Sequence, residues 1–261
     1  MPPPDLAIFT DLDGTLLDHE SYDAAPARPL LDRLSGAGVP VVIASSKTAA
    51  EIAPIRRALG LDRWPAIFEN GAGVLGPGDA APRTRAARAR ILAALERIPQ
   101  DLRARFRGFA EMSAADVAAS TGLAPEDAAR ARERTHTEPG LWRGTDAERA
   151  AFLDALSAEG VSGREGGRFL TLSLGGTKAD RMAEIAGRLG AATTVALGDA
   201  PNDIEMLEAA DHGIVVANPH RAPLPELEGE RQGRITRTAK AGPAGWAEGV
   251  EALLSRLGYR I

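Results

Sequence analysis

The segment Leu6-Ala7-Ile8-Phe9-Thr10-Asp11-Leu12-Asp13-Gly14-Thr15 decides the fold of this chain. Its first half is a short apolar run of the kind that forms a buried strand, and its second half places two carboxylates directly after that strand. Gly14 permits a tight turn, so the backbone N–H groups of Leu12, Gly14 and Thr15 can face a bound anion. Because ligands bind beyond the carboxyl ends of the strands in an open parallel sheet, the segment predicts a strand and a candidate site. Taken alone, the same residues also fit an ordinary turn.

Short apolar runs alternate with helical patterns on both sides of the middle of the chain. The first part predicts strands at residues 6–10, 39–44 and 66–68 and helices at 30–37 and 48–59, the latter opened by a Thr48 and Glu51 capping box. The alternation resumes later with a helix from Lys178, strands at 193–197 and 213–216, and a short helix from Asn202 between these strands. This order predicts an α/β fold with a Rossmann-like parallel sheet.

The middle of the chain has a different texture. Helical stretches rich in Arg and Ala are expected at 84–98, 113–121 and 126–134, followed by a helix at 145–159, opened by Thr145 and Glu148, and a strand at 168–173. We therefore expect a discontinuous core, residues 1–81 and 174–261, and an inserted α/β cap domain, residues 82–173, that selects the substrate.

Composition and charge limit the possible partners. The chain has no cysteine, so a metal would be held by oxygen or imidazole ligands, which favours a hard cation such as Mg²⁺. The formal net charge of −5 gives no overall attraction to nucleic acid or to a membrane, and neither is expected as a partner. The start Met1-Pro2-Pro3-Pro4-Asp5 lacks the pattern of a signal peptide, and no apolar run is long enough to span a bilayer. These features predict a cytoplasmic location and leave the oligomeric state open.

Three further polar motifs follow predicted strands or begin predicted helices. Ser45 and Ser46 lie at the end of the second strand, where a hydroxyl and the next helix N-terminus can bind phosphate. Lys178 begins a helix, where a bound anion would remove its conflict with the helix dipole. The loop Gly198-Asp199-Ala200-Pro201-Asn202-Asp203 offers carboxylates to a hard cation. Each motif also has a plain structural reading, as a helix cap, a solvated lysine or a turn.

In this order, the four motifs resemble those of the haloacid dehalogenase superfamily, in its phosphatase branch with a large α/β cap. The resemblance implies that Asp11 attacks phosphorus and forms an aspartyl-phosphate. It also implies that Asp13 protonates the leaving oxygen and then acts as a base on the water that hydrolyses the intermediate.

The resemblance implies two further sets of site residues. The first would hold Mg²⁺ and consists of Asp11, the backbone carbonyl of Asp13, Asp199 and Asp203, the last as a direct ligand or one step removed. The second would hold the substrate's phosphoryl oxygens and consists of Ser45, Ser46, Lys178 and Asn202, together with the loop Leu12, Gly14 and Thr15.

Within the superfamily, the chain resembles the mannosyl-3-phosphoglycerate phosphatases. The resemblance lies in Ser45-Ser46-Lys47-Thr48, Glu69-Asn70-Gly71, Thr137-Glu138-Pro139-Gly140-Leu141-Trp142, Gly167-Arg168-Phe169 and Gly242-Pro243-Ala244-Gly245-Trp246. It implies a small phosphorylated sugar acid as substrate and a role in making the compatible solute mannosylglycerate. The cap residues expected to contact its hydroxyls or carboxylate are His136, Glu138, Trp142, Arg143 and Arg168, although Trp142 also suits the interior of the cap and His136 its surface.

Other functions stay open at this point. A related phosphatase would act on glucosyl-3-phosphoglycerate or sucrose phosphate, and a phosphomutase would return the phosphate to its substrate. A non-catalytic phosphate-binding module is a different class of protein. The presence of both Asp11 and Asp13 argues against such a module, because binding alone does not need an acid beside a nucleophile.

Overall fold

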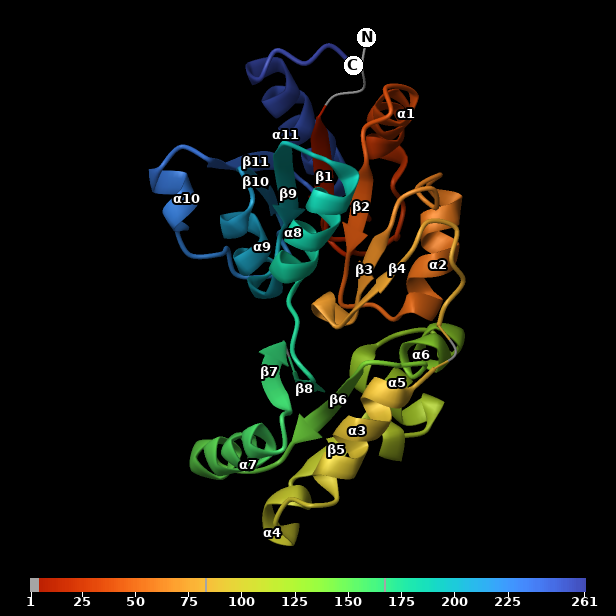
Figure 1. Cartoon of the computed structure of the whole chain (residues 1–261), viewed down its shortest axis with the longest axis vertical. Coiled ribbons are helices and arrows are strands. Elements are labelled where there is room, and N and C mark those ends of the chain that lie inside the picture. Colours follow the sequence, from red (N-terminus) through yellow and green to blue (C-terminus); the bar gives the residue numbers. More distant parts are fainter. Residues whose placement is uncertain (1–4, 83, 167) are drawn as a thin grey trace.

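A mostly parallel sheet forms the centre of the computed structural model, which describes residues 5–82, 84–166 and 168–261 (Figure 1). Within these residues the sheet has the strand order β11-β10-β9-β1-β2-β3-β4, and all neighbours pair in parallel except β3 and β4. The strands are β1 (Leu6–Thr10), β2 (Val41–Ala44), β3 (Ala66–Phe68), β4 (Gly73–Leu75), β9 (Thr193–Gly198), β10 (His212–Ala217) and β11 (Ile235–Ala241). The predicted fold class, an α/β protein with a Rossmann-like sheet and a cap, is confirmed.

Helices cover both faces of this sheet, as the crossovers of parallel strands require. Leu6 and Ile8 of β1 pack on one face with residues of α1, α2 and α11, whereas Ala7 and Phe9 pack on the other with residues of α8 and α9. The core helices are α1 (Arg28–Gly36), α2 (Ala49–Ala58), α8 (Lys178–Leu189), α9 (Ile204–Ala209), α10 (Glu228–Arg231) and α11 (Gly242–Arg256), with short 3₁₀ turns η1 (Ala25–Ala27), η2 (Glu69–Gly71) and η4 (Pro201–Asp203).

The strand β1 joins the two halves of the core. It lies between β2 and β9, and Ile8 pairs with Val41 on one side and Val195 on the other. The chain continues this pairing past the strand, where the Asp11 N–H donates to the Leu197 carbonyl at 2.9 Å. The loops that follow β1, β2 and β9 therefore meet at one edge of the sheet.

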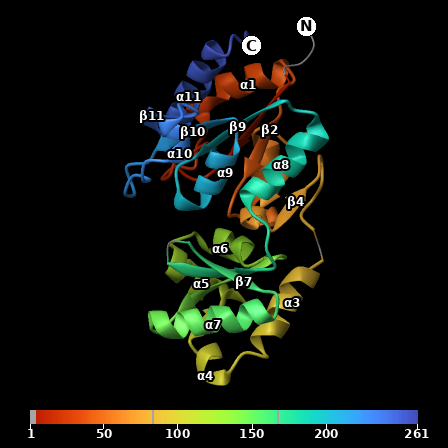
Figure 2. The same cartoon turned by 60° about the vertical axis from the view of Figure 1, so that its left-hand side comes forward.

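A second, antiparallel sheet forms a separate body beyond these strand ends (Figures 1 and 2). Its order is β5-β6-β8-β7, with β5 (Phe106–Gly108), β6 (Thr137–Trp142), β7 (Ser162–Gly166) and β8 (Phe169–Ser173). One cluster of apolar residues joins it to α3 and α7, and another joins it to α5 and α6. The elements outside the sheet are α3 (Ala86–Leu95), α4 (Gln100–Arg103), η3 (Phe109–Glu111), α5 (Ala114–Thr121), α6 (Pro125–Ala131) and α7 (Asp146–Ala158).

The predicted elements agree with the structure most closely where local signals are strong. The capping boxes of Thr48 with Glu51 and of Thr145 with Glu148 are both present. The helices expected at 84–98 and 126–134 are shorter than predicted, because they end at Leu95 and Ala131. The exact domain boundaries stay a prediction. The last core strand before the cap, β4, ends at Leu75, and the last cap strand, β8, ends at Ser173, shortly before the core helix α8 begins at Lys178.

Two parts of the sequence used above lie outside the described residues, namely Met1-Pro2-Pro3-Pro4 and Gly167. Among the described residues, no helix combines the length and the apolar character needed to cross a membrane.

Candidate active site

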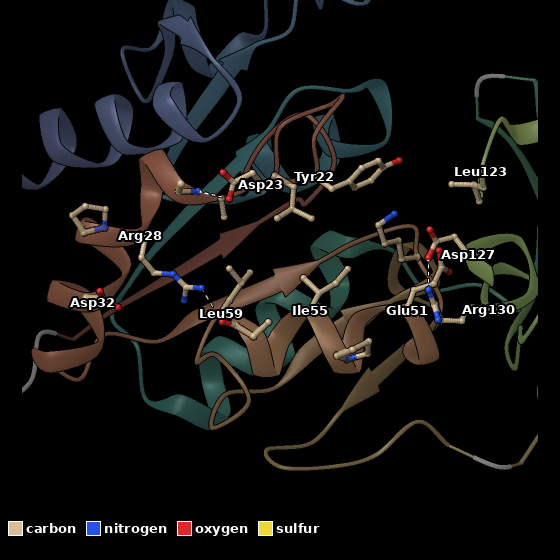
Figure 3. A pocket seen from close by; sticks show the side chains of 17 residues that line it. Tyr22, Asp23, Arg28, Asp32, Glu51, Ile55, Leu59, Leu123, Asp127 and Arg130 are labelled. Atoms are coloured by element: carbon tan, nitrogen blue, oxygen red, sulfur yellow. Dashed lines mark hydrogen bonds and ion pairs between the residues drawn. The ribbon is translucent and has the colours of Figure 1, made fainter. Parts of the chain in front are cut away.

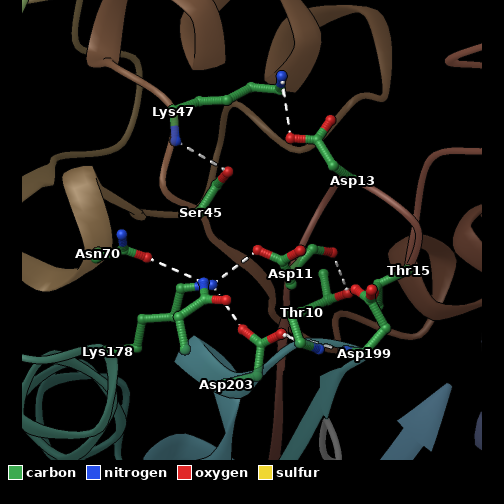
Figure 4. Close-up of polar contacts among 12 residues, drawn as sticks. Thr10, Asp11, Asp13, Thr15, Ser45, Lys47, Asn70, Lys178, Asp199 and Asp203 are labelled. Carbon is green, nitrogen blue, oxygen red and sulfur yellow. Dashed lines mark hydrogen bonds and ion pairs between the residues drawn. The ribbon is translucent and has the colours of Figure 1, made fainter. Parts of the chain in front are cut away.

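Asp11 and Lys178 meet at the carboxyl end of β1. Lys178 is only 2% exposed, and its ammonium donates to Asp11 Oδ1 and to Asp203 Oδ1, each at 2.7 Å (Figure 4). Burial alone would lower the pKa of Lys178, but the two carboxylates outweigh burial and raise this pKa. The lysine is therefore a fixed cation inside the site, and the alternative reading of a solvated side chain is wrong.

Three buried carboxylates lie close together, and two of them, Asp11 and Asp203, contact this lysine. Asp11, Asp199 and Asp203 offer oxygen atoms that all lie within 4.8 Å of one another. Burial raises the pKa of Asp199, and the charge of Asp11 raises it further. Burial also raises the pKa of Asp203 to about 7, because the Lys178 ammonium offsets only part of this effect. Excess negative charge and a purely oxygen donor set fit a hard divalent cation. The structure thus brings together three of the residues predicted to hold the cation, Asp11, Asp199 and Asp203. The fourth predicted ligand, the backbone carbonyl of Asp13, stays a prediction.

Asp13 faces away from the carboxylate cluster. Its Oδ2 pairs with the Lys47 ammonium at 3.0 Å (Figure 4). Its Oδ1 is buried and finds no hydrogen-bond partner among the residues that the structure describes. Burial raises the pKa of Asp13, although the neighbouring Lys47 lowers it in part. A raised pKa favours the protonated carboxyl, which a general acid needs.

Lys178 contacts Asp11, and the other predicted phosphate-binding residues contact neighbouring loops or the cap. Ser45 is fully buried after β2, and its Oγ accepts the Lys47 N–H at 3.2 Å. The carbonyl of Ser46 accepts a hydrogen bond from Arg134 of the cap at 3.0 Å. Asn202 is exposed and donates to Asn70 Oδ1 at 3.1 Å.

The loop after Asp11 differs from the prediction in one respect. The N–H groups of Gly14 and Thr15 donate to the carbonyls of Leu17 and Leu12, at 2.9 and 3.2 Å, so they close the turn instead of facing an anion. The Leu12 side chain is fully buried. The Thr15 hydroxyl instead donates to Asp199 Oδ1 at 2.8 Å, and it fixes this carboxylate. Thr15 therefore positions the acidic cluster, whereas anion binding by the Leu12 N–H stays a prediction.

Other contacts to Asp199 were not foreseen. Asn218 donates to Asp199 Oδ2 at 2.7 Å, and Arg221 lies 3.5 Å from the same oxygen. Gly14 has a φ of +81°, and a Cβ there would lie 2.8 Å from the Asn218 amide nitrogen. The close approach of these two loops therefore requires glycine at position 14.

Glu69 joins the site to the cap, a role that sequence reasoning missed. Its buried carboxylate accepts hydrogen bonds from Thr135 N and Oγ1, His136 N, and Thr137 N and Oγ1. The backbone of Glu69 and Asn70 has φ of 50° and 58°, an unusual conformation for residues other than glycine. The Glu69 N–H donates to the Lys47 carbonyl and the Asn70 N–H to the Ser45 carbonyl, each at 2.9 Å. The motif Glu69-Asn70-Gly71 thus joins the start of the cap strand β6 to the loop after β2 that carries Ser45 and Lys47.

Trp246 supports the strand that carries Asp11. It is fully buried in α11, and its indole N–H donates to Thr10 Oγ1 at 3.0 Å. Thr10 in turn donates to the Asp11 carbonyl at 2.8 Å. The C-terminal motif Gly242-Pro243-Ala244-Gly245-Trp246, identified in the sequence only by resemblance, therefore supports the position of Asp11 through Trp246.

The structure does not bring Glu138 to the site. Its carboxylate is fully buried inside the cap, where it pairs with Arg88 at 2.6 Å and accepts the Ala110 N–H at 2.7 Å. Both oxygens are therefore occupied, and the predicted contact with a sugar hydroxyl does not fit this placement. Trp142 packs on Phe152 within the cap, at a centroid distance of 4.9 Å.

The remaining cap candidates are placed differently. His136 lies just before β6, edge-on to Phe68, and burial lowers its pKa. Arg143 is exposed. Arg168 is exposed and donates to the Ser120 carbonyl of α5 at 2.5 Å. Among the described residues, none of these three side chains forms a hydrogen bond with the acidic cluster.

A parallel core with a cap over its strand ends, and a buried carboxylate cluster between them, define a class of enzymes that act on a substrate held between core and cap. The chain belongs to the haloacid dehalogenase-like hydrolases, because the sequence model of that family matches residues 8–106 and 159–222, which is more than half of its length.

Solved structures support the same fold at low sequence identity. The phosphatase BT1666 from Bacteroides thetaiotaomicron is 19% identical with a TM-score of 0.68, and the alignment covers 98% of this chain and 96% of that one. The sucrose-phosphatase from Synechocystis sp. PCC6803 is 13% identical with a TM-score of 0.63, over 99% and 100%. The subclass IIB sugar phosphatase BT4131 is 17% identical with a TM-score of 0.62, over 97% and 98%. At these identities the likeness concerns the fold.

Proposed function

We propose that the chain is a Mg²⁺-dependent phosphatase that releases phosphate from a small phosphorylated sugar acid. The observation that carries this proposal is the buried group of Asp11, Lys178, Asp199 and Asp203 at the end of β1. It combines a nucleophile, a fixed cation and a set of oxygen ligands at one place. The family and the solved phosphatases of the same fold support it.

Asp11 is the nucleophile of the proposed mechanism. Its Oδ1 is held by Lys178, which leaves Oδ2 to attack phosphorus and form an aspartyl-phosphate. Asp13 gives its proton to the leaving oxygen and then takes one from the water that hydrolyses this intermediate. The raised pKa of Asp13 supports the first of these roles.

The remaining charges stabilise the transferring phosphoryl group. Lys178 provides a cation whose own position is fixed by two carboxylates, so little reorganisation accompanies the reaction. Ser45, Ser46 and Asn202 are proposed to bind phosphoryl oxygens. A divalent cation held by Asp11, the Asp13 carbonyl, Asp199 and Asp203 would neutralise phosphoryl charge when bound.

The proposed substrate is mannosyl-3-phosphoglycerate, hydrolysed to mannosylglycerate and phosphate. This proposal rests on the motifs of the sequence, and Arg168 remains a candidate for the glycerate carboxylate because its side chain is exposed. A second candidate, sucrose phosphate, is favoured by the similarity to a sucrose-phosphatase over almost the whole chain.

Phosphate release tests the catalytic proposal. Purified protein with Mg²⁺ should hydrolyse an artificial aryl phosphate, and Asp11→Asn should abolish turnover while the circular dichroism spectrum stays unchanged. Asp101→Asn, at an exposed position in α4 of the cap, is the matched control and should retain full activity. Normal turnover by Asp11→Asn would rule out this nucleophile.

A substrate panel tests the narrower proposal. The ratio kcat/KM should be highest for mannosyl-3-phosphoglycerate, compared with its glucosyl counterpart, sucrose phosphate and simple hexose phosphates. A clear preference for sucrose phosphate would replace the proposed substrate. In the same panel, Arg168→Ala should raise KM most for substrates that carry a glycerate carboxylate, and equal losses would remove its proposed role.

A further inference from the structure

Tyr22 is an exposed aromatic side chain on the loop that follows the catalytic strand. Among the residues that the structure describes, it is the large hydrophobic side chain that remains exposed, at 49%. Its backbone has a φ of 56°, which is an outlier for a bulky residue. The turn is closed by Asp18, whose N–H donates to the Asp23 carbonyl and whose carbonyl accepts the Tyr22 N–H. The loop thus holds a large ring in solvent at a fixed position.

The ring borders a cavity of about 1010 Å³ between core and cap. Leu17, Tyr22 and Ile55 line its core side, and Leu123, Asp127 and Arg130 line its cap side. In Figure 3 the Tyr22 side chain extends from the core loop toward the cap side of the cavity, where these three residues lie. The cavity is therefore open to a ligand that touches both bodies.

One lining residue of this cavity contacts the proposed general acid, Asp13. Lys47 lines the cavity, and its ammonium lies 5.3 Å from the centroid of the Tyr22 ring and 3.0 Å from Asp13 Oδ2. Figure 4 shows Lys47 and Asp13 on the same side of the site, beyond Asp11. When the leaving oxygen of a substrate approaches Asp13, the rest of the leaving group lies next to this cavity.

We propose that Tyr22 is a specificity residue, whose ring binds the sugar ring of the leaving group against Leu123 of the cap. This inference rests on the proposed function and adds a place for the sugar. The C–H face of a sugar is apolar and suits an aromatic surface, whereas its hydroxyls suit a carboxylate and a guanidinium. Asp127 and Arg130, which pair at 2.6 Å, supply these two groups at the rim of the cavity.

Two substrates that differ only in the sugar test this role. Tyr22→Ala should lower kcat/KM for mannosyl-3-phosphoglycerate by roughly 10- to 100-fold more than for 3-phosphoglycerate, mainly through KM, as expected for lost contacts in an apolar pocket. Tyr22→Phe keeps the ring face and should retain the preference of the unmodified protein. Equal losses of kcat/KM on both substrates would mean that Tyr22 only supports Lys47 and Asp13. No loss of kcat/KM would mean that the ring does not contact the substrate. Either result would overturn the proposal.

Binding of the dephosphorylated product separates this role from catalysis. Saturation-transfer NMR with mannosylglycerate should show transfer from the protein to the sugar protons, and Tyr22→Ala should abolish it while Tyr22→Phe retains it. Transfer without any phosphate release would support the sugar site and refute the proposed phosphatase. Phosphate release from mannosyl-3-phosphoglycerate without Tyr22-dependent transfer would refute the sugar site alone.

Discussion

Replacing Glu69 with Gln should loosen the attachment of the cap to the core. In the most favourable orientation of the new amide, its oxygen takes the place of Oε2 and still accepts the hydrogen bonds from His136 and Thr137. Because this oxygen is uncharged, each of these hydrogen bonds is weaker by about 1 kcal/mol. The amide nitrogen then faces the Thr135 N–H, which loses its acceptor at about 1–3 kcal/mol. Release of the buried charge offsets part of this loss, so we expect a net destabilisation of about 3 kcal/mol.

Calorimetry measures this effect directly. For a chain of this length, about 3 kcal/mol corresponds to a fall in Tm of roughly 6–12 °C. The matched control is Glu251→Gln, because Glu251 pairs with Arg33 at 2.9 Å on the surface, where such pairs contribute little. If Glu69→Gln lowered Tm no more than this control, the hydrogen bonds of Glu69 would not hold the cap in place.

Three further changes test other parts of the site. Burial raises the pKa of Asp203 from 3.8 to about 7. Between these two pH values the folded metal-free protein keeps a proton on Asp203 that the unfolded chain has lost, so its free energy of unfolding should fall as the pH rises from 3.8 to about 7. Mg²⁺ should therefore raise Tm more at about pH 8 than at about pH 5.5, and equal shifts would contradict the assignment. Gly14→Ala places a methyl group about 3.1 Å from Asp199 Oδ2 at a φ of +81°, and it should lower kcat/KM for an aryl phosphate by roughly 100-fold. Unchanged kinetics would show that the loop tolerates the strain. Trp246→Phe loses the hydrogen bond to Thr10 and should lower the free energy of unfolding in urea by about 1 kcal/mol, whereas no change in the urea midpoint would make this contact dispensable.

Local patterns predicted much of the core. The apolar run 6–10 became β1 with its expected bounds, and Thr48 and Thr145 cap the helices that their sequences predict. These signals depend on neighbours a few residues apart, so the sequence displays them directly. The order of the motifs was also informative, because the strand ends of a parallel sheet bring together loops that are far apart in the sequence.

Several elements lacked such signals. Pro139 and Gly140 argue against a strand, yet β6 forms. Pro139 pairs with Thr171 of β8, whereas β5 pairs with β6 only from Gly140 to Trp142, so Pro139 has a partner strand on one side alone. The edge strand β11 was missed because most of its side chains are exposed, so no apolar alternation marks it. The hydrogen bonds of Glu69 join residues more than sixty positions apart, and a single sequence contains no trace of that pairing. For the same reason Glu138, a polar residue in a cap strand, was taken for a ligand of the substrate when its partner is Arg88.

The position of β1 also sets an order of events during synthesis. The strand that carries Asp11 ends at Thr10 and leaves the ribosome long before its neighbour β9, which starts only at Thr193. Translation of the intervening chain takes on the order of 10–40 s, and one edge of β1 stays unpaired throughout. Asp199 and Asp203 arrive with β9 and the loop after it, so the nascent chain acquires its acidic cluster only after the cap has been made. A ribosome-bound chain that ends before β9 should therefore be inactive and prone to aggregate, whatever the state of its cap.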